Sequence, residues 1–176
     1  MDVLLTECRS PVSLRAPDPA LSVALQRALN HSFALHSEFL PWAKPFTSED
    51  EARAFMLRSV EDFNSETGER RFFIVAGEGE AIVGCIGLIP RGRNRHEVGY
   101  WANTEFAGKG YMRRALTALI ADLPGDVFYL TTSSVNLASQ RLAEAAGFAL
   151  IRVFKRARHT ERHGVQDTYL YRLKGA

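Results

Sequence analysis

Residues 107–112 read Ala107-Gly108-Lys109-Gly110-Tyr111-Met112, a glycine-rich turn on which the interpretation of the whole chain depends. The turn follows a segment of strand-forming residues and precedes an apolar, helically spaced segment from about Lys109 to Leu123. Such a helix start exposes backbone N–H groups at the positive end of the helix dipole, and glycines let an anion approach them closely. The turn therefore predicts a phosphate or pyrophosphate site.

The turn differs from two common phosphate-binding motifs. No Ser or Thr follows Lys109, as a P-loop would need, and Arg113 stands where a dinucleotide fingerprint would have its third glycine. Taken alone, the turn fits a plain structural turn about as well as it fits an anion site. The segments around it have to decide between the two.

These segments predict a mixed arrangement of strands and helices. Towards the N-terminus we expect strands at Val12–Arg15, Arg71–Ala76, Ala81–Ile89 and His96–Ala102, a helix carrying Leu21, Leu25 and Leu29, and a helix that starts at the capping box Ser48–Glu51. Towards the C-terminus we expect a strand at Val127–Thr132, a helix at Asn136–Ala146 and strands at Phe148–Phe154 and Thr168–Leu173. The order predicts one domain spanning residues 1–176, of the α/β (α+β) class. Its central sheet would be mixed, mostly antiparallel and six- to seven-stranded, flanked by about four helices.

The composition is that of an ordinary globular protein. Of the 176 residues, 46% are hydrophobic and 24% are charged, with a formal net charge of +2. No apolar run approaches the roughly 18 residues of a membrane span, and the N-terminus does not resemble a signal peptide. Cys8 and Cys85 stand in no zinc or CxxC spacing, so we expect reduced thiols in a soluble cytoplasmic protein, with a disulfide as the alternative. The small net charge gives no reason to expect DNA or a membrane as partner.

Several ordered blocks resemble the GNAT superfamily of N-acetyltransferases, and especially its RimJ/RimL-like group of ribosomal-protein N-terminal acetyltransferases. One block is Glu97-Val98-Gly99-Tyr100-Trp101 together with the glycine turn that follows it. Another is Asn136-Leu137-Ala138-Ser139 with a helix that closes on Gly147-Phe148. Trp42, the acidic helix start at Ser48 and the final strand around Tyr169 also fit. The resemblance covers most of the chain from about Leu40 onward and implies the GNAT fold.

The resemblance also implies a site for acetyl-CoA, in which backbone amides of the turn hold the pyrophosphate. Ala107 stands where the family has Gln or Arg, which would reduce side-chain support without removing the site. Met112 is larger than the Gly or Ala common at its position, which favours the RimL-like group. The cofactor-binding residues implied in this way are Tyr100, Trp101, Ala107, Gly108, Lys109, Gly110, Tyr111, Met112, Arg113, Asn136 and Ser139.

We expect direct transfer of the acetyl group from the thioester to an amine. Glu97 is the candidate general base, because it shares a strand face with Gly99 and Trp101, where a cleft would raise its pKa; an exposed strand residue is the alternative. The backbone N–H of Tyr100 or Trp101 is the candidate donor to the thioester oxygen. By resemblance, Ser139 is the candidate proton donor to the leaving thiolate, with an ordinary helix serine as the alternative.

Neither metal nor covalent catalysis is expected. Neither cysteine has the sequence context of a catalytic nucleophile. No metal site is predicted, because no metal-binding motif contains any of the five histidines, His31, His36, His96, His159 and His163.

The identity of the acceptor is the least determined part of the prediction. The resemblance implies the N-terminal α-amine of a protein, such as a ribosomal protein. A small amine, a polyamine or an antibiotic is an alternative, because acceptor loops vary freely on one fold. A non-catalytic module that binds coenzyme A, RNA or the ribosome is another, suggested by the basic segment Arg152–His159, although a solvated strand and loop is the plainer interpretation. The oligomeric state stays open, with a homodimer as one option.

Overall fold

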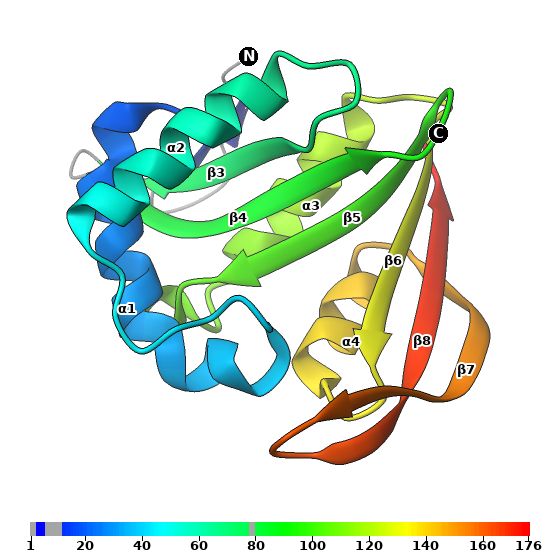
Figure 1. Ribbon diagram of the computed structural model, residues 1–176. Helices are drawn as coiled ribbons and strands as arrows, with labels where there is room; N and C mark the ends of the chain where they lie inside the picture. Colours follow the sequence, from blue (N-terminus) through cyan, green and yellow to red (C-terminus); the bar gives the residue numbers. More distant parts are fainter. Residues whose placement is uncertain (1–2, 6–11, 78–79) are drawn as a thin grey trace.

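Eight strands join into one sheet in the computed structural model, which describes residues 3–5, 12–77 and 80–176 (Figure 1). In chain order they are β1 (Val3–Leu5), β2 (Val12–Arg15), β3 (Arg70–Ala76), β4 (Ala81–Pro90), β5 (Arg95–Ala102), β6 (Val127–Ser133), β7 (Ala149–Thr160) and β8 (Gly164–Lys174). Their order across the sheet is β1-β2-β3-β4-β5-β6-β8-β7. Neighbouring strands are antiparallel, except that β5 and β6 are parallel.

The helices form one layer on each side of the sheet. They are α1 (Ser22–Phe39), α2 (Glu49–Phe63), α3 (Tyr111–Ala121) and α4 (Leu137–Ala145), with 3-10 turns at Pro19–Leu21 and Thr104–Phe106. Phe72 and Ile74 of β3 pack in a core with α3 and α4, while Phe73 and Val75 pack with α1 and α2. This strict alternation along one strand separates the two layers, so that α3 and α1 lie on opposite faces of the sheet.

The sheet splays open in its middle, between β5 and β6. The two strands pair only where Arg95–Glu97 runs beside Val127–Tyr129. Beyond Glu97 the strands diverge, as Figure 1 shows, and the remaining part of β5 pairs with β4 alone. Residues 98–102 of β5 therefore have one edge that is not covered by another strand. The sheet therefore has a gap between these two strands.

The predicted fold class is confirmed, with a few differences in the elements. The sheet has eight strands rather than six to seven, because Val3–Leu5 pairs outside β2 as a further edge strand. The helix α3 begins at Tyr111 instead of Lys109, because Gly108 and Gly110 have left-handed φ angles of 76° and 73°.

The last two strands are longer than predicted. Strand β7 extends to Thr160, and β8 begins at Gly164. Their pairing is irregular between Phe154 and Arg158, where Arg156 has a left-handed φ of 54°, and the ladder continues beyond this irregularity. Lys155 in this segment bonds to Asp167 on β8, and most of the predicted basic segment lies on the exposed outer strand of the sheet.

Two further expectations concern the cysteines and the membrane. Cys85 is a free, buried thiol on β4, whereas Cys8 lies outside the described residues. Among the described residues, no helix is long and apolar enough to cross a membrane.

Candidate active site

The start of α3 exposes backbone donors without a partner from the helix itself. The N-cap residue is Gly110, which has no side chain to accept a hydrogen bond, and the first turn contains no acidic residue. The first intrahelical bond at this end runs from the N–H of Arg114 to the carbonyl of Gly110. The N–H groups of Tyr111, Met112 and Arg113 therefore precede the helical ladder and point out of its end. This is an arrangement that a phosphate group fits.

The residues around this helix start are basic and solvent-accessible. Lys109 and Arg113 are exposed, and the Lys109 ammonium lies 5.3 Å from the centre of the Phe106 ring. Met112 points the other way, since its sulfur would meet a Cβ placed on Gly84 of β4. The larger residue at position 112 is thus accommodated by a glycine on the sheet. Ala107 is exposed and directs no side-chain donor to the turn.

Two backbone N–H groups, those of Tyr100 and Trp101, are the predicted donors to the thioester oxygen. Only one of them lies on the uncovered edge of β5. Just after β5, the backbone N–H of Asn103 donates to the carbonyl of Val83 on β4. At the start of β5, the carbonyl of Arg95 accepts from the backbone N–H of Arg91. Because ladder bonds alternate along an antiparallel strand, odd-numbered residues of β5 bond to β4 and even-numbered residues face the open edge. The N–H of Tyr100 therefore faces the gap, while that of Trp101 is directed to β4.

The side chain of Tyr100 joins β5 to α4 across this gap. Its hydroxyl donates to the carbonyl of Ser139 at 2.9 Å and lies 2.9 Å from the Ser139 hydroxyl. Burial raises the pKa of Tyr100 to about 12, although the bond to Ser139 opposes this, so the phenol stays neutral. Asn136 caps α4 by accepting from the Ser139 N–H at 3.2 Å, which fixes the position of Ser139 relative to Tyr100.

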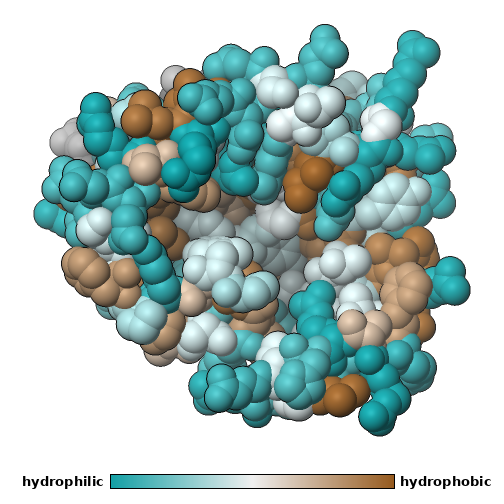
Figure 2. All heavy atoms as spheres, in the orientation of Figure 1, coloured by the Kyte–Doolittle hydropathy of each residue, from teal (hydrophilic) through white to brown (hydrophobic). Residues whose placement is uncertain are grey.

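A cavity of about 650 Å³ opens on the other face of the sheet, under α1 and α2. Its walls are largely apolar and aromatic, and Figure 2 shows this face hollowed at its centre. Phe33, His36, Trp42, Phe55 and Trp101 contribute the rings. Trp42 is 51% exposed, so one wall of the cavity is in contact with solvent.

The floor of this cavity lacks side chains at two neighbouring positions. Gly87 of β4 and Gly99 of β5 are directly paired in the sheet, and both line the cavity. A Cβ added at Gly99 would meet no atom within 4 Å, so the space above this residue is open. Tyr100, next along the strand, also lines the cavity. The cavity thus reaches the backbone segment whose edge faces the gap towards α4.

Glu97 shares the strand face of Gly99 but is not among the residues that line the cavity. Its carboxylate forms an ion pair with Arg91 at 2.6 Å, and its side chain is 35% exposed. Two other carboxylates do line the cavity. Glu69 pairs with Arg71 at 2.5 Å, and Glu51 pairs with Lys44. The structure therefore brings Glu97 to the right strand and face, with its charge directed to Arg91.

Sequence reasoning missed two buried polar residues that shape this region. His36 lies in the cavity wall, 4% exposed, with its Nε2 2.8 Å from the carbonyl oxygen of Ala102. Asn103 is buried just after β5 and donates to the carbonyl of Ile82, while its Oδ1 accepts from the N–H of Glu105. Ser32 of α1 donates to the same Oδ1. Only the three-dimensional packing of α1 on the end of β5 gives these side chains their roles.

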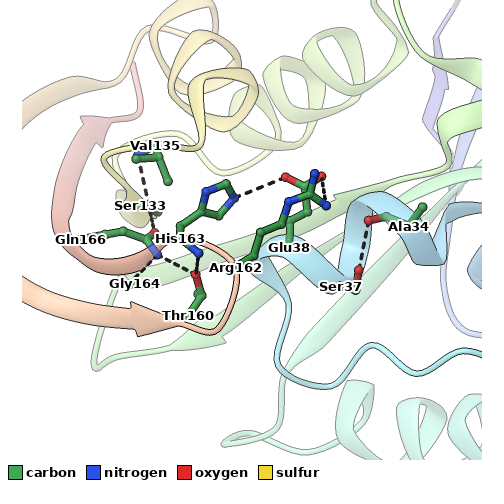
Figure 3. Close-up of polar contacts among 10 residues, drawn as sticks. All are labelled: Ala34, Ser37, Glu38, Ser133, Val135, Thr160, Arg162, His163, Gly164 and Gln166. Atoms are coloured by element: carbon green, nitrogen blue, oxygen red, sulfur yellow. Dashed lines mark hydrogen bonds and ion pairs between the residues drawn. The ribbon is translucent and has the colours of Figure 1, made fainter.

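A further contact joins α1 to the turn between β7 and β8, as Figure 3 shows. Glu38 pairs with Arg162 at 3.1 Å and lies 3.4 Å from the His163 ring, which stacks on Phe39. The turn itself is ordered by Thr160, whose hydroxyl accepts from the N–H of His163. The two halves of the splayed sheet are therefore connected through α1, which also provides the cavity wall.

The cysteine that lines the cavity is not prepared to act as a covalent nucleophile. Cys85 lines the cavity, yet burial, and to a lesser degree the charge of Glu69, raises the pKa of its thiol far above the ordinary range. A thiol in that state is not a nucleophile at neutral pH. Among the described residues, no three His, Cys, Asp or Glu side chains are grouped to hold a metal ion.

Comparisons with known proteins agree with this arrangement. The acetyltransferase (GNAT) domain family matches residues 12–149. No curated protein matches the chain in sequence. Among solved structures, RimL, a ribosomal L7/L12 α-N-protein acetyltransferase in complex with coenzyme A, superimposes with a TM-score of 0.85 at 20% identity over 98% of both chains.

Two other solved structures are similar. The Salmonella typhimurium acetyltransferase that modifies the N-terminal serine of ribosomal protein L7/L12 has a TM-score of 0.81 at 21% identity over 100% of both chains. The microcin C7 self-immunity acetyltransferase MccE, in complex with acetyl-CoA and AMP, has a TM-score of 0.82 at 21% identity, over 93% of this chain and 92% of its own. At these identities the likeness establishes a common fold.

Proposed function

The chain belongs to the GNAT acetyltransferase family, and we propose that within this family it acetylates the N-terminal α-amine of a protein or peptide. It is an N-acetyltransferase that uses acetyl-CoA. The acceptor proposal is supported by the RimL structures, whose acceptor is a protein α-amine. It is also supported by the size and the open, aromatic wall of the cavity under α1 and α2.

The proposed mechanism depends on the arrangement of three features around the edge of β5. The free helix start of α3 and the Tyr100–Ser139 pair lie on one side of the β5 edge, while the cavity opens on the other. We assign the pyrophosphate of acetyl-CoA to the N–H groups that begin α3, with Lys109 and Arg113 beside it. The arm of acetyl-CoA would then follow the gap between β5 and β6, and its thioester would come to the edge of β5 at Tyr100.

Each group at this edge has a proposed part in acetyl transfer. The N–H of Tyr100 donates to the thioester oxygen as negative charge develops there. The Ser139 hydroxyl, held by Asn136 and Tyr100, donates a proton to the departing sulfur. The cavity holds the acceptor amine against the same carbonyl carbon, which converts a bimolecular reaction into one between positioned groups. Glu97 remains a proposed base, but its carboxylate is not at the cavity wall, so it can receive the amine proton only through an intermediate carrier such as water.

Filling the cavity floor tests the proposed acceptor site. Gly99→Leu introduces a side chain into open space at a position whose backbone is not left-handed, so the fold should tolerate it. The change should lower kcat/KM for a serine-initiated peptide at least about 100-fold and leave the acetyl-CoA dissociation constant within about twofold. Acetylation is followed by mass spectrometry, with the same peptide carrying an Nα-acetyl group as the negative control.

Spermidine serves as the competing acceptor in the same assay. Faster acetylation of spermidine than of the serine-initiated peptide would replace the peptide with a small-molecule acceptor. Undiminished activity of Gly99→Leu would remove the cavity from the acceptor site altogether.

A further inference from the structure

His36 is a buried histidine in the cavity wall that neither the sequence motifs nor the proposed roles above include. It belongs to α1, which is outside the blocks around the glycine turn. Its ring contacts two indoles edge-to-face, with centroid distances of 5.8 Å to Trp42 and 5.5 Å to Trp101. These two indoles are themselves 6.5 Å apart. The three rings form an aromatic corner of the cavity, and His36 provides its only titratable group.

The hydrogen bonding of His36 fixes which nitrogen carries the proton. Nε2 lies 2.8 Å from the carbonyl oxygen of Ala102, which can only accept, so Nε2 donates. In the neutral ring, Nδ1 then has a free lone pair. Nδ1 makes no hydrogen bond with the described part of the chain, and it is not among the buried polar atoms that lack a partner. It is therefore open to the cavity.

The protonation state suits a base at neutral pH. Burial lowers the pKa of His36, and the bond to Ala102 only partly offsets this effect. The ring is consequently neutral near pH 7. The other charged or titratable side chains around it are Glu38 on α1, Lys44 before α2, Glu51 and Arg58 on α2, Glu69 and Arg71 at β3, Cys85 on β4, Tyr100 on β5, and Arg162 and His163 in the β7–β8 turn. Of these, three ion pairs neutralise their own charges, namely Lys44–Glu51, Arg71–Glu69 and Glu38–Arg162.

The position along β5 places His36 close to the proposed reaction centre. Ala102, which holds the ring, and Tyr100, whose N–H faces the proposed position of the thioester, are both even-numbered residues on the open edge of the strand. Residues two apart on one side of a strand are separated by about 7 Å. The His36 ring is bonded at Ala102 and lines the cavity. It is thus within reach of an amine that attacks a thioester carbonyl held at Tyr100.

We propose that His36 is a catalytic residue that accepts the proton of the attacking amine at Nδ1. This proposal rests on the proposed function, because it uses the same acceptor cavity. The electron pair of the amine nitrogen forms the new C–N bond while the carbonyl π pair moves to oxygen, and the nitrogen loses one proton to Nδ1. The oxygen pair then re-forms the carbonyl as the C–S bond breaks, and sulfur leaves with its electron pair and takes the proton of the Ser139 hydroxyl, which a proton from solvent replaces. His36 returns its proton to solvent, so that the products are an amide and free coenzyme A.

An alkylating donor tests this geometry without any acceptor. Bromoacetyl-CoA carries an electrophilic carbon in the place of the acetyl methyl group, and the free Nδ1 should attack it. Tandem mass spectrometry of the wild-type enzyme should find the label on His36, and excess coenzyme A should prevent it. His163, which stacks on the same helix outside the cavity, should stay unlabelled. Coenzyme-protected labelling of another residue, or no labelling while coenzyme A still binds, would overturn the proposal.

A substitution supplies the kinetic test. His36→Gln keeps an amide N–H that can donate to Ala102 but has no basic nitrogen. It should lower kcat for the serine-initiated peptide about 100-fold or more, with the acetyl-CoA dissociation constant unchanged, and it should abolish the label. A loss of less than threefold would refute the role of His36. If no peptide is acetylated by the wild type, the proposed acceptor fails, while the labelling result still decides whether Nδ1 faces the acetyl position.

Discussion

The N-termini of α2 and α3 solve the same physical problem in opposite ways. Every helix starts with backbone N–H groups that have no partner within the helix. At α2 the chain supplies the partners: the Ser48 hydroxyl accepts from the N–H of Glu51 at 3.2 Å, and the Glu51 carboxylate accepts from the N–H of Ser48 at 2.8 Å. At α3 the N-cap is Gly110, which has no side chain to offer.

The charged residues at the two helix starts show the same contrast. The first turn of α2 contains Glu49, Asp50 and Glu51, which complement the positive end of the helix dipole. The first turn of α3 has no acidic residue, and Lys109 and Arg113 are next to it. Basic residues at a helix start are unfavourable for the helix alone. The difference teaches that α2 is completed by its own side chains, whereas the start of α3 is left open for the anion that we propose binds there.

A carboxylate at the start of α3, like those at the start of α2, should have the largest effect on acetyl-CoA binding. Gly110→Asp places a carboxylate at the helix start, and Asp tolerates left-handed backbone better than most residues. A carboxylate about 4 Å from a phosphate charge repels it by about 4 kcal/mol at an effective dielectric constant of 20. The acetyl-CoA dissociation constant, measured by calorimetry, should therefore rise at least about 100-fold.

The matched control for this change is Gly110→Asn, which has the same shape and no charge. Asn should weaken acetyl-CoA binding much less than Asp, so that the ratio of the two dissociation constants reports the charge. Equal binding by the Asp and Asn variants would mean that the pyrophosphate is not at this helix start.

A smaller loss is expected when the basic residues of α3 are removed. The double change Lys109→Ala and Arg113→Ala should weaken acetyl-CoA binding about tenfold, because each exposed charge contributes up to about 1 kcal/mol. The effect should shrink in 0.5 M salt. Arg53→Ala, an exposed arginine on α2, is the control and should leave the dissociation constant unchanged. A change of the same size at Arg53 would show that only the overall charge matters.

The smallest effect on binding is expected at the start of α2. Ser48→Ala removes the capping hydroxyl and should reduce the free energy of unfolding by about 1 kcal/mol, which lowers Tm by about 2–4 °C in a protein of this size. Acetyl-CoA affinity should not change. Weaker acetyl-CoA binding in this variant, with an unchanged Tm, would contradict the division of roles between the two helices.

Both helix starts could be predicted from the sequence because their signals are local. The spacing of Ser48 and Glu51 predicts a capping box, and the structure contains both of its bonds. The turn with Gly108 and Gly110 predicts an anion site, although these glycines also delay the helix to Tyr111 because their φ angles are left-handed. In each case the relevant atoms lie within a few residues of one another along the chain.

The cavity could not be predicted in the same way, because its walls come from distant segments. His36 gains its role only through the carbonyl of Ala102, 66 residues away in sequence. Glu97 was predicted to face the cleft from strand alternation, which gives the face correctly. Alternation does not predict which charged residue lies beside Glu97. In the structure, Arg91 across the β4–β5 turn forms an ion pair with its carboxylate. The partial pairing of β5 with β6, which exposes the N–H of Tyr100, likewise depends on tertiary structure.

Thermal unfolding with and without acetyl-CoA tests most directly that the start of α3 is a coenzyme site. At 100 times its dissociation constant, acetyl-CoA should stabilise the protein by about 2.7 kcal/mol, a rise in Tm of about 5–10 °C. ATP and NAD at the same concentration and salt should give a much smaller shift, and Gly110→Asp should lose most of the acetyl-CoA shift. An unchanged Tm with acetyl-CoA, or an equal shift with all three ligands, would contradict the account.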